Sequence, residues 1–166
     1  MGLKVLVAYA SRHGSTREVA EEIGTTIEGD DARVDLMQAE EVGSLQGYDL
    51  VIVGGALYTG RWHKDAISLI QRQHDALAQI PFAVYAMGPR TLEDADVAAS
   101  RHQLDVALAK LPVEPFAVTV FGGVVDPAKL HFPLSRMPAV DARDHTAIQA
   151  WAHEVLAASA AAASVR

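Results

Sequence analysis

The sequence contains no cysteine, and this absence excludes several kinds of chemistry. Without thiols the chain has no disulfide, no thiolate metal site, no iron–sulfur cluster and no cysteine nucleophile. Basic residues are also few, because 14 Lys and Arg stand against 21 Asp and Glu and give a formal net charge of −7. This balance argues against a nucleic-acid-binding protein, which needs a basic face, and against contact with an anionic membrane surface.

Long hydrophobic runs are missing as well. No apolar run approaches the ~20 residues that a membrane-spanning helix requires. The apolar stretch near the amino terminus, residues 5–10, is shorter than the core of a signal peptide. We therefore expect a cytoplasmic protein. Its 166 residues suit a single domain, 1–166, with a sizeable core.

Short apolar segments alternate along the chain with patterns of helical spacing. Such alternation implies an α/β fold, in which a parallel sheet is covered by helices on both faces. We expect the strand at 33–37 to lie at an edge, the strand at 50–53 to end at two glycines, and the alanine-rich tail after 156 to fray. The predicted strands are 3–9, 33–37, 50–53, 82–87 and 116–121, and the predicted helices are 16–27, 64–79, one through 97–111, and 148–156.

Four of the predicted strands end in loops of unusual composition, at 11–16, 54–62, 88–91 and 122–126. In an open α/β sheet, ligands bind outside the carboxyl ends of the strands. These loops are therefore the default candidate site.

The first loop joins a strand directly to a helix through Ser11, Gly14, Ser15 and Thr16. Backbone N–H groups, hydroxyls and the positive end of a helix dipole together make a phosphate site. The alternative is ordinary N-capping by Ser15 or Thr16, with Gly14 in the turn. The loop lacks the glycine patterns of nucleoside triphosphatases and dinucleotide-binding proteins. The preceding strand also lacks the acidic residues with which a receiver domain holds Mg²⁺.

The second loop gathers three glycines with Tyr58 and Trp62. Glycine lets the backbone approach a ligand closely, and aromatic faces suit a planar ring. A phosphate cradle beside an aromatic loop fits FMN. The alternative is that both aromatic rings only pack the loop onto the sheet.

The remaining candidates are polar side chains. The seven histidines form no metal-binding motif, so we expect no metal. His63 is either a proton donor at the ring edge or a surface residue. Arg90 either balances an anion, such as a reduced flavin, or is exposed without a role. Before the last helix, a cap by Asp144 with an ion pair by Arg143 is the simpler interpretation.

Three segments, YASRHGSTREVAEEI, YDLVIVGGALYTGRWHK and VYAMGP, resemble the flavodoxin superfamily. The forms S-x-x-G-x-T-R-E, G-A-L-Y-x-G-x-W-H and D-A-R-D-H-x-A-I-x-x-W-A are similar to the branch that includes the menaquinone-dependent protoporphyrinogen oxidases. The resemblance implies a flavodoxin-like three-layer sandwich, with a five-stranded parallel sheet of order 2-1-3-4-5 and bound FMN. The segment 126–140 is shorter than the insertion of the oxidases, and Arg12 and His13 replace the middle of the usual flavodoxin loop.

By position, the resemblance implies one set of residues for the phosphate and two sets for the flavin ring. The expected cofactor-binding residues are Ser11, Arg12, His13, Gly14, Ser15 and Thr16 in the first set, and Ala56, Leu57, Tyr58, Thr59, Gly60, Trp62, Met87, Gly88, Pro89 and Arg90 in the others.

Three functions remain open at this point. The first is an FMN-dependent oxidoreductase that acts on a quinone, a porphyrinogen or a similar conjugated substrate. The second is a flavodoxin-type electron carrier that docks on partner redox proteins, to which the acidic net charge is suited. The third is a cofactor-free flavodoxin fold that binds a partner. No nucleic acid is expected in any of them, and the sequence does not give an oligomeric state.

Overall fold

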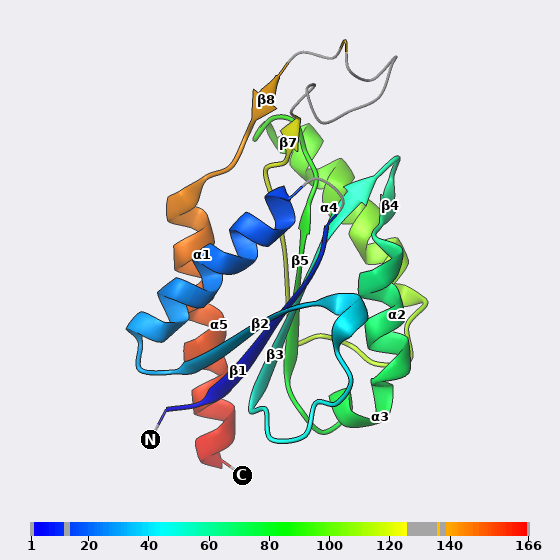
Figure 1. The fold of residues 1–166 in the computed structure, drawn as a ribbon. Helices are drawn as coiled ribbons and strands as arrows, with labels where there is room; N and C mark the ends of the chain where they lie inside the picture. Colours follow the sequence, from blue (N-terminus) through cyan, green and yellow to red (C-terminus); the bar gives the residue numbers. More distant parts are fainter. Residues whose placement is uncertain (1, 12–13, 126–135, 137–138, 166) are drawn as a thin grey trace.

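The computed structural model describes residues 2–11, 14–125, 136 and 139–165 (Figure 1). Five parallel strands form the main sheet in the order β2-β1-β3-β5-β6, and the short β4 pairs antiparallel with β3. Without β4, this is the predicted order 2-1-3-4-5, with the 33–37 strand at an edge as expected. The strands are β1 (Lys4–Ala10), β2 (Arg33–Gln38), β3 (Leu50–Tyr58), β4 (Arg61–Trp62), β5 (Phe82–Met87) and β6 (Ala117–Phe121).

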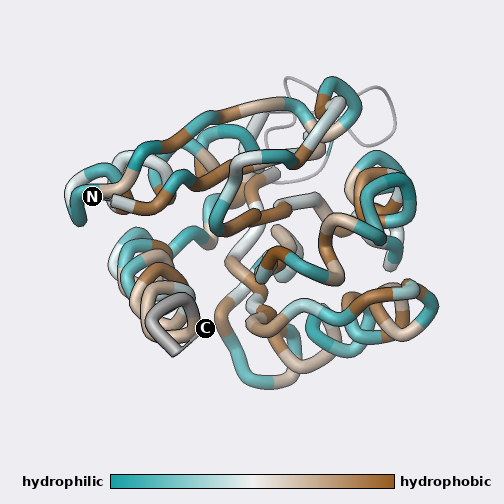
Figure 2. Tube along the Cα trace, turned by 90° about the horizontal axis from the view of Figure 1, so that it is seen from below, coloured by the Kyte–Doolittle hydropathy of each residue, from teal (hydrophilic) through white to brown (hydrophobic). Residues whose placement is uncertain are grey.

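Helices cover both faces of the sheet, so the molecule has three layers. One face carries α1 and α5, and the other carries α2 and α4 (Figure 1). Seen from below, hydrophobic segments gather toward the middle of the molecule (Figure 2). The helical elements are α1 (Ser15–Gly29), η1 (Ala39–Glu41), α2 (Lys64–Arg72), α3 (His74–Leu77), α4 (Asp94–Ala109) and α5 (His145–Val165).

The continuous apolar run of β1 follows from its position between these layers. Val5 and Val7 pack in the hydrophobic cluster under α1 and α5, whereas Leu6 and Ala8 pack in the cluster under α2 and α4. Successive side chains of a strand point to opposite faces, so a strand covered on both sides needs apolar residues at every position. The fully buried strand predicted here is confirmed.

The prediction that β3 ends at its two glycines is wrong, because the strand continues through both of them to Tyr58. A Cβ atom at Gly54 would lie 1.9 Å from Cζ of Tyr85, and one at Gly55 would lie 2.7 Å from Nε1 of Trp62. Each glycine thus makes room for a large ring against the strand rather than ending it.

Two helices also differ from their predictions. The helix expected at 64–79 is divided at Gln73, whose φ is −107°, into α2 and α3. The alanine-rich tail expected to fray is helical as far as Val165, as suits the residue with the highest helix propensity. A small hairpin, β7 (Val124–Val125) with β8 (Val140–Asp141), precedes α5, while most of the segment 126–140 lies outside the described residues. Among the described helices, none is long and apolar enough to cross a membrane.

Candidate functional site

Strand register brings the four candidate loops together at one end of the sheet. Ala10 of β1 pairs with Gly55 of β3, and Met87 of β5 pairs with both Ala56 of β3 and Phe121 of β6. The loops that follow these strands therefore lie side by side, at the upper end of the sheet in Figure 1.

The first loop forms an open cradle at the start of α1. Gly14 is the N-cap residue with φ +89°, its N–H donates to Oγ of Ser11 at 2.9 Å, and no described side chain caps the helix. The sequence left open that Ser15 or Thr16 is the N-cap residue, but in the structure both lie inside α1. A Cβ atom at Gly14 would meet nothing within 4 Å. Arg12 and His13, which were predicted to contribute here, lie outside the described residues.

Thr16, in the first turn of α1, carries a hydroxyl for which the described part of the chain offers no partner. The residue is fully buried, and its Oγ1 has no hydrogen-bond partner among the described residues. Its carbonyl oxygen accepts a hydrogen bond from Oη of Tyr85 at 3.0 Å, and burial raises the pKa of that phenol, which keeps it protonated as a donor. A buried hydroxyl without a partner is costly. The cradle therefore suits a group that accepts hydrogen bonds, such as a phosphate.

The second loop is a hairpin with a two-residue turn. Thr59 and Gly60 both have positive φ, at 49° and 79°, as in the primed turns that suit the twist of paired strands. Leu57 and Tyr58 are half-buried, whereas the two turn residues are exposed. The hairpin contacts α4, because a Cβ atom at Gly60 would lie 3.6 Å from Nε2 of Gln103, a residue of that helix. This contact with α4 lies at the end of the sheet where the candidate loops gather.

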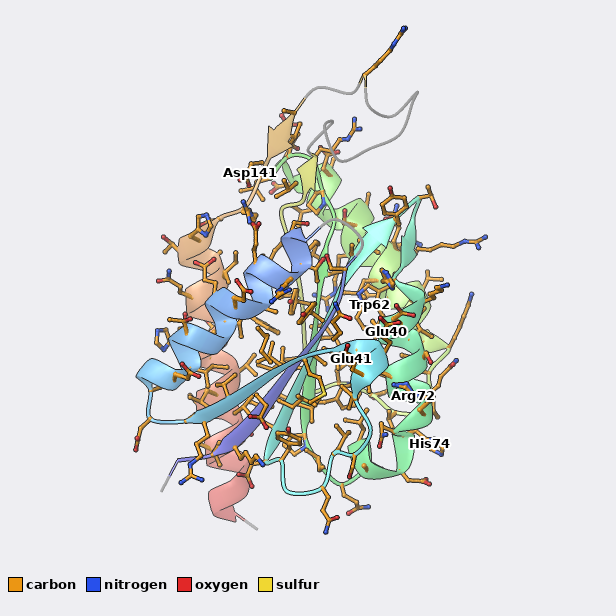
Figure 3. All side chains as sticks on the ribbon, viewed as in Figure 1. Glu40, Glu41, Trp62, Arg72, His74 and Asp141 are labelled. Atoms are coloured by element: carbon orange, nitrogen blue, oxygen red, sulfur yellow. The ribbon has the colours of Figure 1, made fainter. Side chains whose placement is uncertain are left out.

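Trp62, labelled in Figure 3, lies underneath the hairpin. Its ring is 2% exposed, and its Nε1 donates to the carbonyl oxygen of Gly55 at 3.1 Å. A ring buried in this way offers no face to a ligand. We therefore expect Trp62 to position the loop, which is the packing role that the sequence left open.

The third and fourth loops are joined by backbone hydrogen bonds. Gly88 N–H donates to the Phe121 carbonyl at 3.1 Å, and Gly123 N–H donates to the Pro89 carbonyl at 2.7 Å. A Cβ atom at Gly88 would lie 2.6 Å from Cδ1 of Leu57, so this loop also packs closely on the second one.

Met87 is 3% exposed and its side chain packs under α1 and α5, so it can meet a ligand only through its backbone. Ala56, Pro89 and Arg90 complete the predicted set around these loops, with Arg90 exposed.

His63 has a structural role that the sequence did not reveal. Its Nδ1 accepts a hydrogen bond from the backbone N–H of Asp65 at 3.1 Å, so His63 caps α2. The side chain is 13% exposed rather than at the free surface. His131 lies outside the described residues, and among the described ones no three His, Asp or Glu side chains gather to hold a metal.

The segment before α5 behaves as predicted and adds one contact that was not. Asp144 caps α5 through a 3.1 Å hydrogen bond from Ala147 N–H, and Arg143 forms the expected ion pair, with Asp141. Hydrogen bonding from Arg143 lowers the pKa of Asp141 to about 2. The unexpected contact is a second ion pair from Arg143 to Glu18 in the first turn of α1.

Comparisons with known proteins agree with this arrangement. The flavodoxin domain family matches residues 6–137 of the chain. A short-chain flavodoxin associated with a PDU bacterial microcompartment is 14% identical, with a TM-score of 0.58 over 95% of this chain and 99% of that one. Flavodoxin 2 from Bacillus cereus is 21% identical, with a TM-score of 0.59 over 93% and 97%.

The similarity also extends to one domain of a larger enzyme. Rubredoxin oxygen:oxidoreductase from Desulfovibrio gigas is 15% identical, with a TM-score of 0.59 over 95% of this chain but 36% of that one. No curated protein matches the sequence. At these identities the solved structures establish the fold, and the family match establishes the membership.

Proposed function

This chain belongs to the flavodoxin domain family, and from that membership we propose that it binds FMN and transfers electrons. Members of this family generally bind FMN. The observation that carries the proposal is the buried hydroxyl of Thr16, which has no partner among the described residues and lies two residues after the left-handed Gly14 at the N-terminus of α1. A phosphate monoester satisfies that hydroxyl and is favoured by the helix dipole.

The first loop is proposed to hold the phosphate. The left-handed Gly14 turns the chain so that the first N–H groups of α1 open into the cradle. Ser11 and Ser15 are half-buried in the same loop and are proposed to donate through their hydroxyls, together with Thr16. Arg12 and His13 remain proposed contributors by their place in the sequence.

The second and third loops are proposed to flank the flavin ring. Of the two aromatic residues of the hairpin, Tyr58 is the one that is not fully buried. Its half-buried side chain suits stacking on a planar ring system. Gly88 leaves no side chain between its backbone and Leu57, which keeps the third loop close to the hairpin. The wider proposed set for the ring is Ala56, Leu57, Tyr58, Thr59, Gly60, Met87, Gly88, Pro89 and Arg90, with Trp62 supporting it from below.

When bound, FMN supplies the redox chemistry, and the protein binds it, orients it and sets its potential. A carrier that docks on partner redox proteins is supported by the net charge of −7, which steers association with basic partners.

A second candidate is an oxidoreductase for a quinone, a porphyrinogen or a similar conjugated substrate. It is favoured by the similarity of the G-A-L-Y-x-G-x-W-H loop to the oxidase branch. In this alternative the substrate meets the ring edge directly, and Arg90 is exposed beside the third loop, where it would attract an anionic substrate.

The first test is the visible spectrum of the purified protein before and after FMN is added and the sample desalted. A flavin spectrum that survives desalting supports the proposal, whereas a colourless protein that does not respond to FMN favours the cofactor-free alternative. Reductive titration then separates the two redox roles. Two resolved one-electron steps favour the carrier, and a single two-electron step with turnover on added quinone favours the oxidoreductase.

A further inference from the structure

Arg143 lies at the junction between the first loop and the fourth, although it comes late in the chain. Its Nε and Nη2 donate to the two carboxylate oxygens of Asp141 at 3.0 and 2.8 Å. Its Nη1 donates to Oε2 of Glu18 at 2.5 Å. The side chain is 15% exposed, so these bonds are partly shielded from water.

Asp141, Arg143 and Glu18 form a cluster of ion pairs, and Glu18 connects this cluster to the phosphate cradle. Its backbone N–H donates to the carbonyl oxygen of Gly14 at 3.1 Å, which is the bond that closes the first turn of α1. A side chain that fixes Glu18 therefore fixes the turn on which the cradle is built. Gly14, the N-cap residue, has no side chain that could cap the helix, so among the described residues the turn depends on contacts such as this one.

The part of this cluster formed by Asp141 and Arg143 is connected to the fourth loop, and through it to the third loop, which is proposed to flank the flavin ring. Ala142, next to Arg143, donates its N–H to Gly123 at 3.0 Å, and Gly123 in turn donates to Pro89. A Cβ atom at Gly122 would lie 1.9 Å from the Ala142 carbonyl oxygen, so the two segments pack without space between them. Asp141, labelled in Figure 3, is the last residue of β8 and lies at the upper end of the molecule, above the start of α5.

We propose that Arg143 is a positioning residue of the phosphate site: through Glu18 it holds the first turn of α1 against the rigid junction of the third and fourth loops. Arginine suits this role because its planar fork can bond two carboxylates at once, whereas lysine presents one point charge. The inference rests on the proposed binding of FMN and deepens it. Arg143 itself is not proposed to contact the flavin.

The test compares FMN with riboflavin, which has the same ring but no phosphate. Affinities are measured by quenching of flavin fluorescence on the purified apoprotein. We expect Arg143→Met and Glu18→Ala each to lower FMN affinity about tenfold, and the double variant to lose no more than either single one. Riboflavin affinity stays within about twofold of the unaltered protein.

Arg143→Lys separates geometry from charge. It keeps the positive charge but cannot reproduce the paired bonds to Asp141 together with the bond to Glu18, so we expect it to bind FMN as weakly as Arg143→Met. The matched control is Arg101→Met, which removes an arginine with a 3.0 Å ion pair to Asp105 within α4 and should leave both affinities unchanged.

Hydrogen exchange of the apoprotein tests the positioning without any flavin. We expect Arg143→Met to speed exchange at the amide of Glu18, whereas Arg101→Met does not. The unaltered protein could fail to bind FMN while Arg143→Met still speeds exchange at the Glu18 amide. In that case the proposed function fails and the structural role of Arg143 stands.

Four results of the affinity measurements would overturn the inference. They are unchanged FMN affinity in Arg143→Met, equal losses for FMN and riboflavin, a gain of FMN affinity in Glu18→Ala, or full recovery in Arg143→Lys. Unchanged exchange at Glu18 in Arg143→Met would overturn it as well.

Discussion

Replacing Thr16 with valine removes one hydroxyl and keeps the shape of the side chain, so it isolates the unpartnered Oγ1. This hydroxyl is buried and has no hydrogen-bond partner within the part of the chain that the structure describes. An unsatisfied buried polar group costs about 1–3 kcal/mol, and threonine and valine have similar helix propensities. We therefore expect Thr16→Val to stabilise the apoprotein by about 1 kcal/mol, or about 2–4 °C in Tm for a chain of this size.

The same substitution has the opposite effect on the FMN complex. A hydrogen bond to a charged group contributes about 1.5–3 kcal/mol, so its loss lowers FMN affinity about ten- to a hundredfold. Urea unfolding of the apoprotein and titration of flavin fluorescence measure the two effects separately. The opposite signs are the signature of a hydroxyl reserved for the ligand.

Thr26→Val is the matched control, because Thr26 lies on the same helix but its Oγ1 donates to the Glu22 carbonyl at 2.8 Å. It should bring no gain in stability and no change in FMN affinity. The reasoning is refuted if Thr16→Val destabilises the apoprotein and leaves FMN affinity intact.

Three further substitutions test other parts of the site. Gly14→Asp should abolish FMN binding, because a carboxylate enters the open cradle and meets the phosphate; Gly47→Asp is the control, since Gly47 has a similar φ of +92° and equally open space. Tyr58→Ala should weaken FMN about tenfold by loss of ring stacking and shift its reduction potential, as measured by fluorescence and redox titration. Asp141→Asn should lower the free energy of unfolding above pH 4 by about 1 kcal/mol or less, because the carboxylate is half exposed and screened. The pKa of Asp141 is lowered from 3.8 to about 2 in the folded protein, so this contribution is present above 3.8 and is lost as the pH falls through 2.

Each of these predictions has a contradicting outcome. Near-native FMN affinity in Gly14→Asp would refute the phosphate assignment. If neither affinity nor potential changes in Tyr58→Ala, that ring only packs the hairpin. If the stability difference caused by Asp141→Asn persists at pH 2, the ion pair with Arg143 is not its origin.

The layers could be predicted because the signals for them are local, whereas the strand order was implied by the resemblance to the flavodoxin superfamily. The apolar run of β1 and the helical spacing of Val19, Ala20 and Ile23 each follow from a few neighbouring residues. The loops could be located for the same reason, since in a parallel sheet they must follow the carboxyl ends of the strands.

What could not be predicted depends on contacts between distant parts of the chain. Gly54 and Gly55 look like a strand end in the sequence, and only the rings of Tyr85 and Trp62 explain why the strand continues. The bond between Arg143 and Glu18 joins residues 125 positions apart, and no pattern of spacing indicates it.

The first helix of the chain packs against the last one. Ile23 and Ile27 of α1 share a hydrophobic cluster with Ile148, Trp151 and Val155 of α5. During synthesis, which proceeds from the amino terminus, this helix can pack on β1, β2 and β3 early, whereas its contact with α5 forms only after the residues of α5 have been made. Contacts so distant in sequence also slow folding. A truncation within α5 should therefore loosen the packing of α1, the helix that begins at the cradle.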